Sequence, residues 1–158
     1  AWGETQTKSE YNTGNYSLVD MTSYQLKSAG VIDDNNCLTP LYDAATVNWG
    51  ADWKMPTDDQ LEALINEDLV NVWNAVINGK PGLVSGDLDN QNEVFIPKSG
   101  NIFNTYYVGE DESGHYYSSK YDSEHNYSIR YLLIAPTYYS LGNSASVYGY
   151  SIRPVLSE

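Results

Sequence analysis

The most informative part of the sequence is TVNWGADWKMPTDDQLEALI, residues 46–65, because several independent signals within it agree on one structure. Thr57 precedes a run of good helix formers and Gln60 follows three residues later, which is the pattern of a capping box. Asp58 and Asp59 fall in the first turn, where the positive end of the helix dipole favours carboxylates. The sequence therefore predicts a short helix that begins after Thr57.

The same helix carries an apolar stripe, and two tryptophans precede it. Leu61, Leu64 and Ile65 are spaced at i, i+3 and i+4, so they share one face of the helix and are expected to be buried. Trp49 and Trp53 lie just ahead of the helix, and each can bury a large apolar area. We therefore expect the hydrophobic core to be anchored at this corner of the molecule.

Four motifs, in order along the chain, resemble those of a known family of bacterial modules. They are AWGE at residues 1–4, DAATVNWGADWKMPTDDQLEAL at 43–64, EVFIPKSG at 93–100 and YGYSIRPV at 148–155. Together they make nearly the whole chain similar to the Fibrobacter succinogenes major paralogous domain family. The resemblance implies a C-type-lectin-like fold and a secreted or cell-surface, extracytoplasmic location. It also implies a strand ahead of Ala1, which we expect to be missing or trimmed from this chain.

The bulk composition favours one acidic domain that spans residues 1–158. The chain has 158 residues, with 8 Lys and Arg against 21 Asp and Glu, so its net charge is −13. Such a chain is repelled by phosphate backbones and by anionic membranes, which argues against nucleic-acid binding. No run approaches the roughly 20 apolar residues that span a bilayer. We therefore expect neither a nucleic-acid partner nor membrane insertion.

Short strand-like runs separated by turn signals make up most of the remaining chain. Residues 70–77 have the character of a strand, and the Asn78-Gly79 that follows is a strong hairpin signal. Further strands are predicted at residues 82–86, 93–97, 115–119, 127–135 and 148–155, a short helix at 22–29, an extended segment or short helical turn at 44–49, and an acidic loop at 109–114. This pattern predicts an α+β domain with mostly antiparallel short strands and one or two short helices.

Potential metal ligands occur in one acidic segment. Residues 87–93 place oxygen-bearing side chains at alternate positions, as a calcium ion prefers. Asn92 and Lys98, however, stand where an EF-hand loop would need Gly and Glu. The Glu-Pro-Asn and Trp-Asn-Asp triplets of sugar-binding C-type lectins are also absent from the sequence. A solvated turn is therefore favoured over a metal site.

Residues that could support catalysis are few. Cys37 is the only cysteine, which excludes an intrachain disulfide and a zinc site built on cysteines. His115 and His125 are the only histidines, and no Gly-x-Ser-x-Gly motif is present. The sequence therefore predicts no enzyme activity and no cofactor.

Tyrosine dominates the C-terminal part of the chain. Most of the 15 tyrosines fall within residues 114–150, interleaved with Ser, Asn, Asp and His. Tyrosine gives contact area at low entropic cost, and in C-type-lectin-like proteins the final strands and their loops form the ligand face. In a plain-sheet alternative, half of these tyrosines are simply core residues. The predicted ligand-binding residues are Tyr117, Tyr121, His125, Asn126, Tyr138, Tyr139, Asn143 and Tyr148.

The same mixture of residue types suggests sequence diversification. Codons for Tyr, Ser, Asp and His each lie one base change from the Asn codons AAT and AAC. Adenine-directed mutagenesis leaves this mixture in the variable proteins of diversity-generating retroelements, which share the lectin-like fold. We therefore predict a bacterial extracytoplasmic module that binds a protein or peptide partner through its Tyr-rich C-terminal face. Two alternatives stay open, a carbohydrate-binding module whose tyrosines stack on sugar rings and a structural subunit of a surface assembly.

Overall fold

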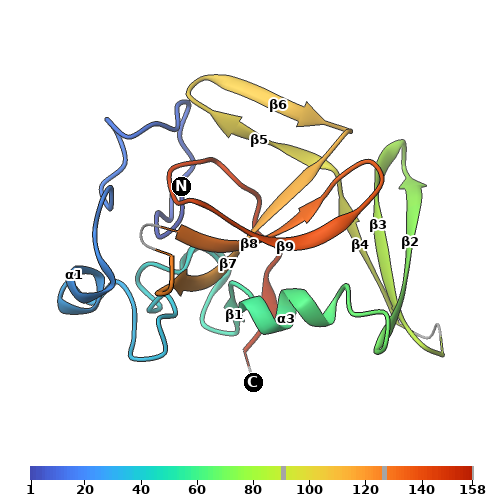
Figure 1. The fold of residues 1–158 in the computed structure, drawn as a ribbon, viewed down its shortest axis with the longest axis horizontal. Coiled ribbons are helices and arrows are strands. Elements are labelled where there is room, and N and C mark those ends of the chain that lie inside the picture. The colour runs from blue at the N-terminus through green and yellow to red at the C-terminus, as the bar shows by residue number, and fades with distance from the viewer. Residues whose placement is uncertain (90–91, 126–127, 158) are drawn as a thin grey trace.

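The computed structural model describes residues 1–89, 92–125 and 128–157 and has an α+β fold in which strands predominate (Figure 1). The helices in these ranges are α1 (Ser23–Ser28), α2 (Ala44–Trp49) and α3 (Asp58–Ala63). The strands are β1 (Trp53–Lys54), β2 (Val70–Ile77), β3 (Lys80–Asp87), β4 (Glu93–Pro97), β5 (Ser99–Phe103), β6 (Tyr106–Glu110), β7 (Gly114–Asp122), β8 (Ser128–Ile134), β9 (Tyr139–Ala145) and β10 (Val155–Leu156). The predicted α+β class is confirmed.

Helix α3 begins as the sequence predicts. The Thr57 hydroxyl oxygen accepts a hydrogen bond from the backbone N–H of Gln60 at 3.3 Å. The Gln60 side chain in turn accepts one from the backbone N–H of Thr57 at 3.0 Å, which completes the capping box. Leu61 is fully buried, and Leu64 and Ile65 pack partly buried against the same core. The predicted cap and apolar stripe are both confirmed.

Strands β2, β3 and β4 form a three-stranded antiparallel sheet at the right of Figure 1. Asn78 and Gly79 connect β2 to β3 with φ angles of 53° and 79°. Two consecutive positive φ angles define a type I′ turn, whose twist matches that of the flanking strands. Ile77 therefore pairs with Lys80 directly across the turn. The predicted strand at residues 70–77 and the hairpin turn are confirmed.

The larger sheet has five strands in the order β6-β5-β7-β8-β9. Strands β7, β8 and β9 are antiparallel neighbours, whereas β5 runs parallel to β7 and meets it at a single pair, Gly100 and Gly114. The pairing of β7 with β8 is irregular between Tyr117 and Tyr121. A separate two-stranded ladder joins β1 to β10. This sheet supplies the surface on which the candidate site is built.

Buried side chains form two clusters on opposite sides of β7 and β8. One lies toward the N-terminal segment and consists of Trp2, Leu26, Val31, Ile32, Leu38, Ala44, Ala45, Met55, Tyr117, Tyr121 and Ile129. The other lies toward α3 and the three-stranded sheet and consists of Leu61, Leu83, Ile96, Tyr116, Leu132 and Ile134. Successive side chains of a strand point to opposite faces, so the neighbours Tyr116 and Tyr117 enter different clusters.

The tryptophan that anchors the core is not one of the two predicted. Trp49 is 54% exposed at the end of α2, so its predicted role in the core is wrong. Trp53 is partly buried against the first cluster. Trp2, in contrast, is only 1% exposed, and its indole N–H donates to the carbonyl of Ser118 at 3.0 Å. This contact joins the N-terminal segment to β7.

Residues 44–49, left open by the sequence, form helix α2, and Asp43 explains why. One of its carboxylate oxygens accepts hydrogen bonds from the backbone N–H groups of Ala45 and Thr46 at 2.9 and 3.0 Å, which caps the helix. The other accepts from the backbone N–H of Met55 at 2.8 Å. The buried carboxylate therefore fixes α2 and the segment before α3 relative to each other.

The part of the chain from residue 99 onward differs most from prediction. Residues 148–154 do not form the predicted strand: Gly149 and Ser151 make isolated bridges to Ile102 and Tyr116, and only Val155–Leu156 is a strand. Strands β5, β6 and β9 were not predicted, and the acidic loop at 109–114 is shorter than expected because β6 continues to Glu110. The predicted turn at residues 87–93 lies partly outside the described residues.

Candidate binding face

Two predicted ligand-binding residues are core residues. Tyr117 is 2% exposed, and its hydroxyl lies 3.0 Å from the carbonyl oxygen of Tyr148 and 3.2 Å from that of Ala145. Burial raises the pKa of Tyr117 well above its usual value. Tyr121 is 4% exposed, with its ring centroid 6.2 Å from that of Trp2. The expectation that these two side chains are surface residues is wrong.

His125 and Asn143, both predicted ligand-binding residues, come together in an exposed polar cluster. The Asn143 amide nitrogen lies 3.2 Å from Nδ1 of His125, and the Asn143 carbonyl oxygen accepts from Arg130 at 2.9 Å. His125 Nδ1 also lies 2.8 Å from the carboxylate of Asp122. Burial would raise the pKa of Asp122, but hydrogen bonds from the His125 ring and from backbone N–H groups outweigh it and lower that pKa. Asn126 lies outside the described residues.

This polar cluster borders a hollow of about 530 Å³ whose charges largely compensate one another. Lys120 and Arg130 both approach the carboxylate of Asp58, at 3.5 and 3.9 Å. Asp122 and Glu124 also line the hollow. With bases and acids interleaved in this way, the hollow has no strong preference for a ligand of either charge.

The predicted Tyr138 and Tyr139 lie at the other end of β9. Tyr138 is 57% exposed in the turn before β9, where its carbonyl accepts from the backbone N–H of Ala135 at 2.8 Å. The Tyr139 hydroxyl donates to the carboxylate of Glu67, and this bond raises the pKa of Tyr139. The predicted ligand-binding residues Tyr138 and Tyr139 therefore lie apart from the polar cluster of His125 and Asn143.

Half-buried aromatic rings instead gather on one face of the five-stranded sheet. Strand pairing places His115 opposite Leu133, Tyr117 opposite Tyr131, and Tyr131 opposite Gly142. Paired residues share a face of the sheet, so the rings of His115, Tyr117 and Tyr131 lie on the same side. The rings of His115 and Tyr131 stack at a centroid distance of 5.7 Å and an angle of 14°.

Tyr150 joins these rings to the segment that follows β9. Its centroid lies 4.9 Å from that of His115, 4.6 Å from Tyr117 and 5.1 Å from Tyr131. Tyr148 stacks on Tyr150 at 5.6 Å and 10°, and Phe103 of the β5–β6 hairpin lies 5.0 Å from Tyr148. We call the open part of this cluster the aromatic face: Phe103, His115, Tyr131, Tyr148 and Tyr150.

The aromatic face is electrically neutral near pH 7. Burial lowers the pKa of His115, which keeps the imidazole uncharged. Burial also raises the pKa of Tyr131, and it raises that of Tyr150 to about 12, so both hydroxyls stay protonated. The Tyr150 hydroxyl lies 2.9 Å from the Ser144 hydroxyl of β9. Neutral rings with polar tips can stack on a ligand and donate hydrogen bonds to it.

Gly142 makes room for this arrangement. A Cβ atom at position 142 would lie only 3.0 to 3.3 Å from atoms of the Tyr131 ring. Such separations are too close for a relaxed contact between carbon atoms. The absence of a side chain at Gly142 therefore leaves room for the Tyr131 ring of the neighbouring strand β8.

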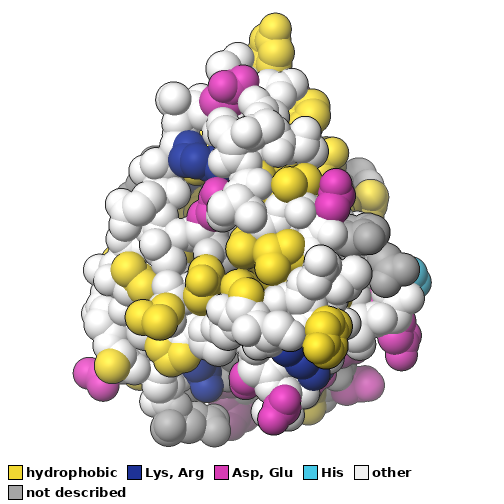
Figure 2. All heavy atoms as spheres, turned by 90° about the vertical axis from the view of Figure 1, so that its left-hand side faces the viewer, with side chains coloured by type: hydrophobic (Ala, Val, Ile, Leu, Met, Phe, Trp, Pro, Cys, Tyr) yellow, Lys and Arg dark blue, Asp and Glu magenta, His cyan; other side chains and the backbone are white. Residues whose placement is uncertain are grey.

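Exposed apolar side chains extend the aromatic face along the β5–β6 hairpin. Tyr106 and Val108 of β6 are exposed, as is Phe103 at the end of β5, which pairs with Tyr106 on the same face of the hairpin. The hairpin projects at the top of Figure 1. Figure 2 shows hydrophobic side chains, tyrosines included, at this projecting end and in a broken band below it. An open apolar band of this kind is typical of an interaction surface.

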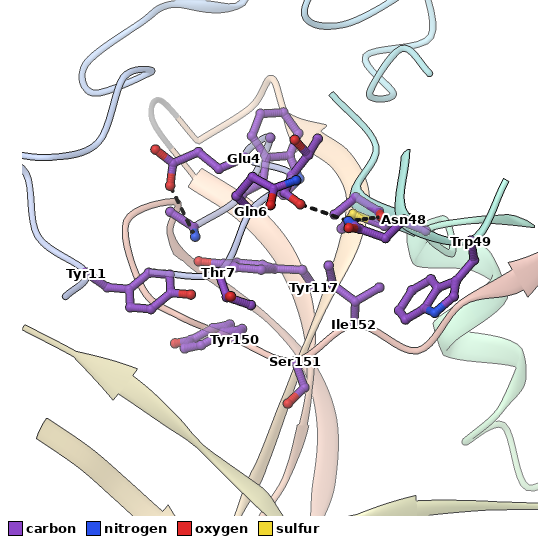
Figure 3. Close-up of a pocket in the computed structure, with 16 residues that line it drawn as sticks. Glu4, Gln6, Thr7, Tyr11, Asn48, Trp49, Tyr117, Tyr150, Ser151 and Ile152 are labelled. Atoms are coloured by element: carbon purple, nitrogen blue, oxygen red, sulfur yellow. Dashed lines mark hydrogen bonds and ion pairs between the residues drawn. The ribbon is translucent and has the colours of Figure 1, made fainter. Parts of the chain in front are cut away.

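A cleft of about 510 Å³ lies on the inner side of Tyr150, beneath the N-terminal segment. Figure 3 shows Tyr11 at one end and Trp49 at the other, with Tyr150 and Ile152 between them. The carboxylate of Glu4, which lines the cleft, is neutralised by the ammonium of Lys8 at 2.7 Å. Aromatic walls without net charge suit a neutral ligand.

The sequence pointed to this region but not to its central residues. Among the aromatic-face residues only Tyr148 was predicted; Phe103, His115, Tyr131 and Tyr150 were not. The two-residue periodicity of β7 could have identified His115, because it lies two positions from the predicted Tyr117 and side chains so spaced share a face of the sheet. Phe103 and Tyr150 join through contacts between distant segments, which no local pattern marks.

Metal binding and membrane insertion concern the described part of the chain in two respects. No group of three or more His, Cys, Asp or Glu side chains within it is placed to hold a metal ion. No helix within it has the length and apolar character that crossing a bilayer requires. The candidate site rests on the ring contacts of the aromatic face and on the cleft beside it.

No protein-family model matches the chain, and no curated protein or solved structure matches it either. The resemblance carried by the four sequence motifs stays a prediction.

Proposed function

We propose that this chain is a bacterial extracytoplasmic binding module that recognises a protein or peptide partner through the aromatic face. The observation that carries the proposal is the half-open cluster centred on Tyr150, in which the rings of His115, Tyr131 and Tyr148 already contact the Tyr150 ring. Because the rings hold one another in place, a partner can contact them at little cost in side-chain entropy. The C-type-lectin-like resemblance supports the same region, since it assigns the ligand face to the final strands.

The proposal excludes catalysis and cofactors as the main role. The rings of the aromatic face are uncharged and hold no carboxylate or thiol that could act as a nucleophile. The net charge of −13 disfavours a nucleic-acid partner. Contact by stacking and hydrogen bonding is the chemistry that this surface can perform.

A peptide selection tests the proposal. Random peptides displayed on phage are selected on the immobilised wild-type protein, and the affinities of the winners are measured by titration. We expect Tyr148→Ala and Phe103→Ala to weaken these peptides by about tenfold or more, since aromatic anchors dominate such interfaces. Tyr24→Ala is the matched control, because Tyr24 is exposed on α1 away from the aromatic face. Equal effects of all three variants would contradict the proposal.

Carbohydrate binding is a second candidate function, and the cleft favours it. Trp49 is half-exposed at one end of a neutral cleft that is large enough for a sugar ring. A glycan array probed with the wild type and with Trp49→Ala tests this candidate. Retention of a glycan by the wild type and its loss from Trp49→Ala would favour it over peptide recognition.

Diversification of the aromatic face is part of the proposal and is tested on DNA. Most of its rings come from residues 114–155, the segment in which Tyr, Ser, Asp and His are mixed. We expect a near-copy of the coding segment for residues 114–155 close by, differing at adenines and beside a reverse-transcriptase gene. If the flanking DNA contains no such copy, the diversification hypothesis is refuted, whereas the binding proposal is unaffected.

A further inference from the structure

Strand β2 is an open edge of the three-stranded sheet. The sheet order β2-β3-β4 gives β2 one neighbour only, β3. Figure 1 places β2 at the outer margin of the molecule, with no other element beyond it. The edge of a sheet presents backbone N–H and C=O groups that a further strand can pair with.

The register of the hairpin identifies the outward-facing groups. Across a two-residue turn, Ile77 and Lys80 form a hydrogen-bonded pair, and such pairs alternate along an antiparallel ladder. The backbone groups of Val72, Asn74 and Val76 therefore point away from β3. These residues offer three N–H donors and three carbonyl acceptors in a row.

Two hydrogen bonds support this assignment. The carbonyl of Pro81, opposite Val76, accepts from the backbone N–H of Lys98 at 2.8 Å and so faces away from β2. The N–H of Val70, at the start of the row, donates to the carbonyl of Asn66 at 3.0 Å, outside the β2–β3 ladder. In the part of the chain that the structure describes, no hydrogen bond joins the backbone of residues 72, 74 and 76 to another element.

Strand β2 lacks the features that usually protect an edge. Its sequence VNVWNAVI contains no charged residue and no proline, although natural edge strands are commonly blocked by Lys or Pro. Val76 is 70% exposed, and Trp73 and Ile77 are exposed on the other face of the strand. Apolar side chains thus border the open edge on both faces of the sheet.

Acidic side chains lie at both ends of the edge. Glu67 and Asp68 precede β2 at one end. At the other end the Lys80 ammonium lies 2.9 Å from the Glu110 carboxylate and 3.3 Å from that of Asp111. Two carboxylates against one ammonium leave a net negative charge at this end. Antiparallel pairing of two copies of β2 would bring these acidic ends together. Charge complementarity therefore favours a partner strand with basic ends over a second copy of this chain.

We propose that β2 is a docking edge that accepts an extended, apolar segment of a partner protein with Lys or Arg at its ends, as an added β-strand. Backbone hydrogen bonds to residues 72, 74 and 76 supply affinity, and the side chains beside them select alternating apolar residues. This surface shares no residue with the aromatic face, so it constitutes a second interaction site.

The test uses a defined peptide and two variants at one position. The probe is a labelled ten-residue peptide of alternating Val and Thr with Lys at both ends, measured by fluorescence anisotropy. Asn74→Pro removes an outward N–H at a position where an edge strand tolerates proline, and Asn74→Thr keeps it. We expect saturable binding that Asn74→Pro weakens by about tenfold or more and Asn74→Thr leaves nearly unchanged. Thermal melts of both variants verify folding.

A second part of the test changes only the peptide, so its result can be interpreted even if the Asn74→Pro variant fails to fold. N-methylation of one set of alternate residues should abolish binding while N-methylation of the other set does not, because a strand pairs through one edge. Replacing the terminal Lys residues by Glu should weaken binding at low salt. Tyr148→Ala should leave binding unchanged, which separates this site from the aromatic face.

Three results would overturn the proposal. The first is no saturable binding of the Lys-ended peptide at millimolar concentration. The second is equal loss with both methylated peptides, which would mean that backbone pairing is not involved. The third is a dimer of the protein alone in sedimentation velocity that Asn74→Pro dissociates, which would make a second copy the occupant.

Discussion

Replacing Tyr117 by Phe is the sharpest way to establish that this side chain belongs to the core. The substitution keeps the ring and removes only the hydroxyl, which is shared between the carbonyl oxygens of Tyr148 and Ala145. Losing one hydrogen bond and leaving a partly buried carbonyl without its donor costs about 1–3 kcal/mol. A loss of about 2 kcal/mol, the middle of this range, lowers the melting temperature of a chain of this length by about 4–8 °C.

Urea denaturation followed by tryptophan fluorescence measures this loss directly. We expect a lower midpoint with an unchanged m-value, because the surface exposed on unfolding does not change. Tyr24→Phe is the control, since Tyr24 is 79% exposed and its free energy of unfolding should stay within about 0.5 kcal/mol of the wild type. If Tyr117→Phe is as mild as this control, Tyr117 is not held as the structure describes.

Two further predictions concern the core and its tyrosines. Trp2→Ala should lower the free energy of unfolding by about 3–5 kcal/mol, whereas the half-exposed Trp49→Ala should cost less than about 1 kcal/mol in the same urea assay; the reverse order would contradict the assignment of the core. Burial raises the pKa values of Tyr16, Tyr117 and Tyr150 above that of an unfolded tyrosine, about 10. Stability should therefore be unaffected by these groups below pH 10 and fall as pH rises further, because the unfolded state releases their protons first. Tyrosinate absorbance reports ionisation and circular dichroism reports folding, and both are followed in one pH titration. Ionisation of every tyrosine near pH 10 while the protein is still folded would contradict the prediction.

Local signals in the sequence were reliable where one short segment contained the whole interaction. The capping box of Thr57 and Gln60 joins residues three positions apart, and the Asn78-Gly79 turn fixes its own hairpin. Neither depends on distant parts of the chain. Helix α3 and the β2–β3 hairpin were therefore predicted correctly.

Long-range packing decided the features that the sequence did not reveal. Trp49 and Trp2 are equally apolar, but only Trp2 meets Ser118, 116 positions away, and enters the core. Strand β9 carries Gly, Ser and Asn and has no strong strand propensity of its own. It is a strand because β8 pairs with it over its full length.

The candidate site shows the same division. Composition located it within the Tyr-rich C-terminal part of the chain. Strand parity alone does not decide which tyrosines are open, because Tyr117 and Tyr131 are paired on one face of the sheet. Long-range packing decides it: Tyr117 belongs to the first core cluster, whereas Tyr131 packs against that cluster and stays partly exposed. Tyr150 reached the site through the irregular segment that was expected to be a strand.

Mapping a bound peptide by two-dimensional amide NMR tests the central proposal most directly. The spectrum of the wild type is recorded with and without the tightest peptide from the selection. We expect the largest shifts at His115, Tyr131, Gly142, Tyr148 and Tyr150, and small ones along β2 and at Trp49. Largest shifts at β2 or around Trp49, with the aromatic face unmoved, would contradict the assignment of binding to that face.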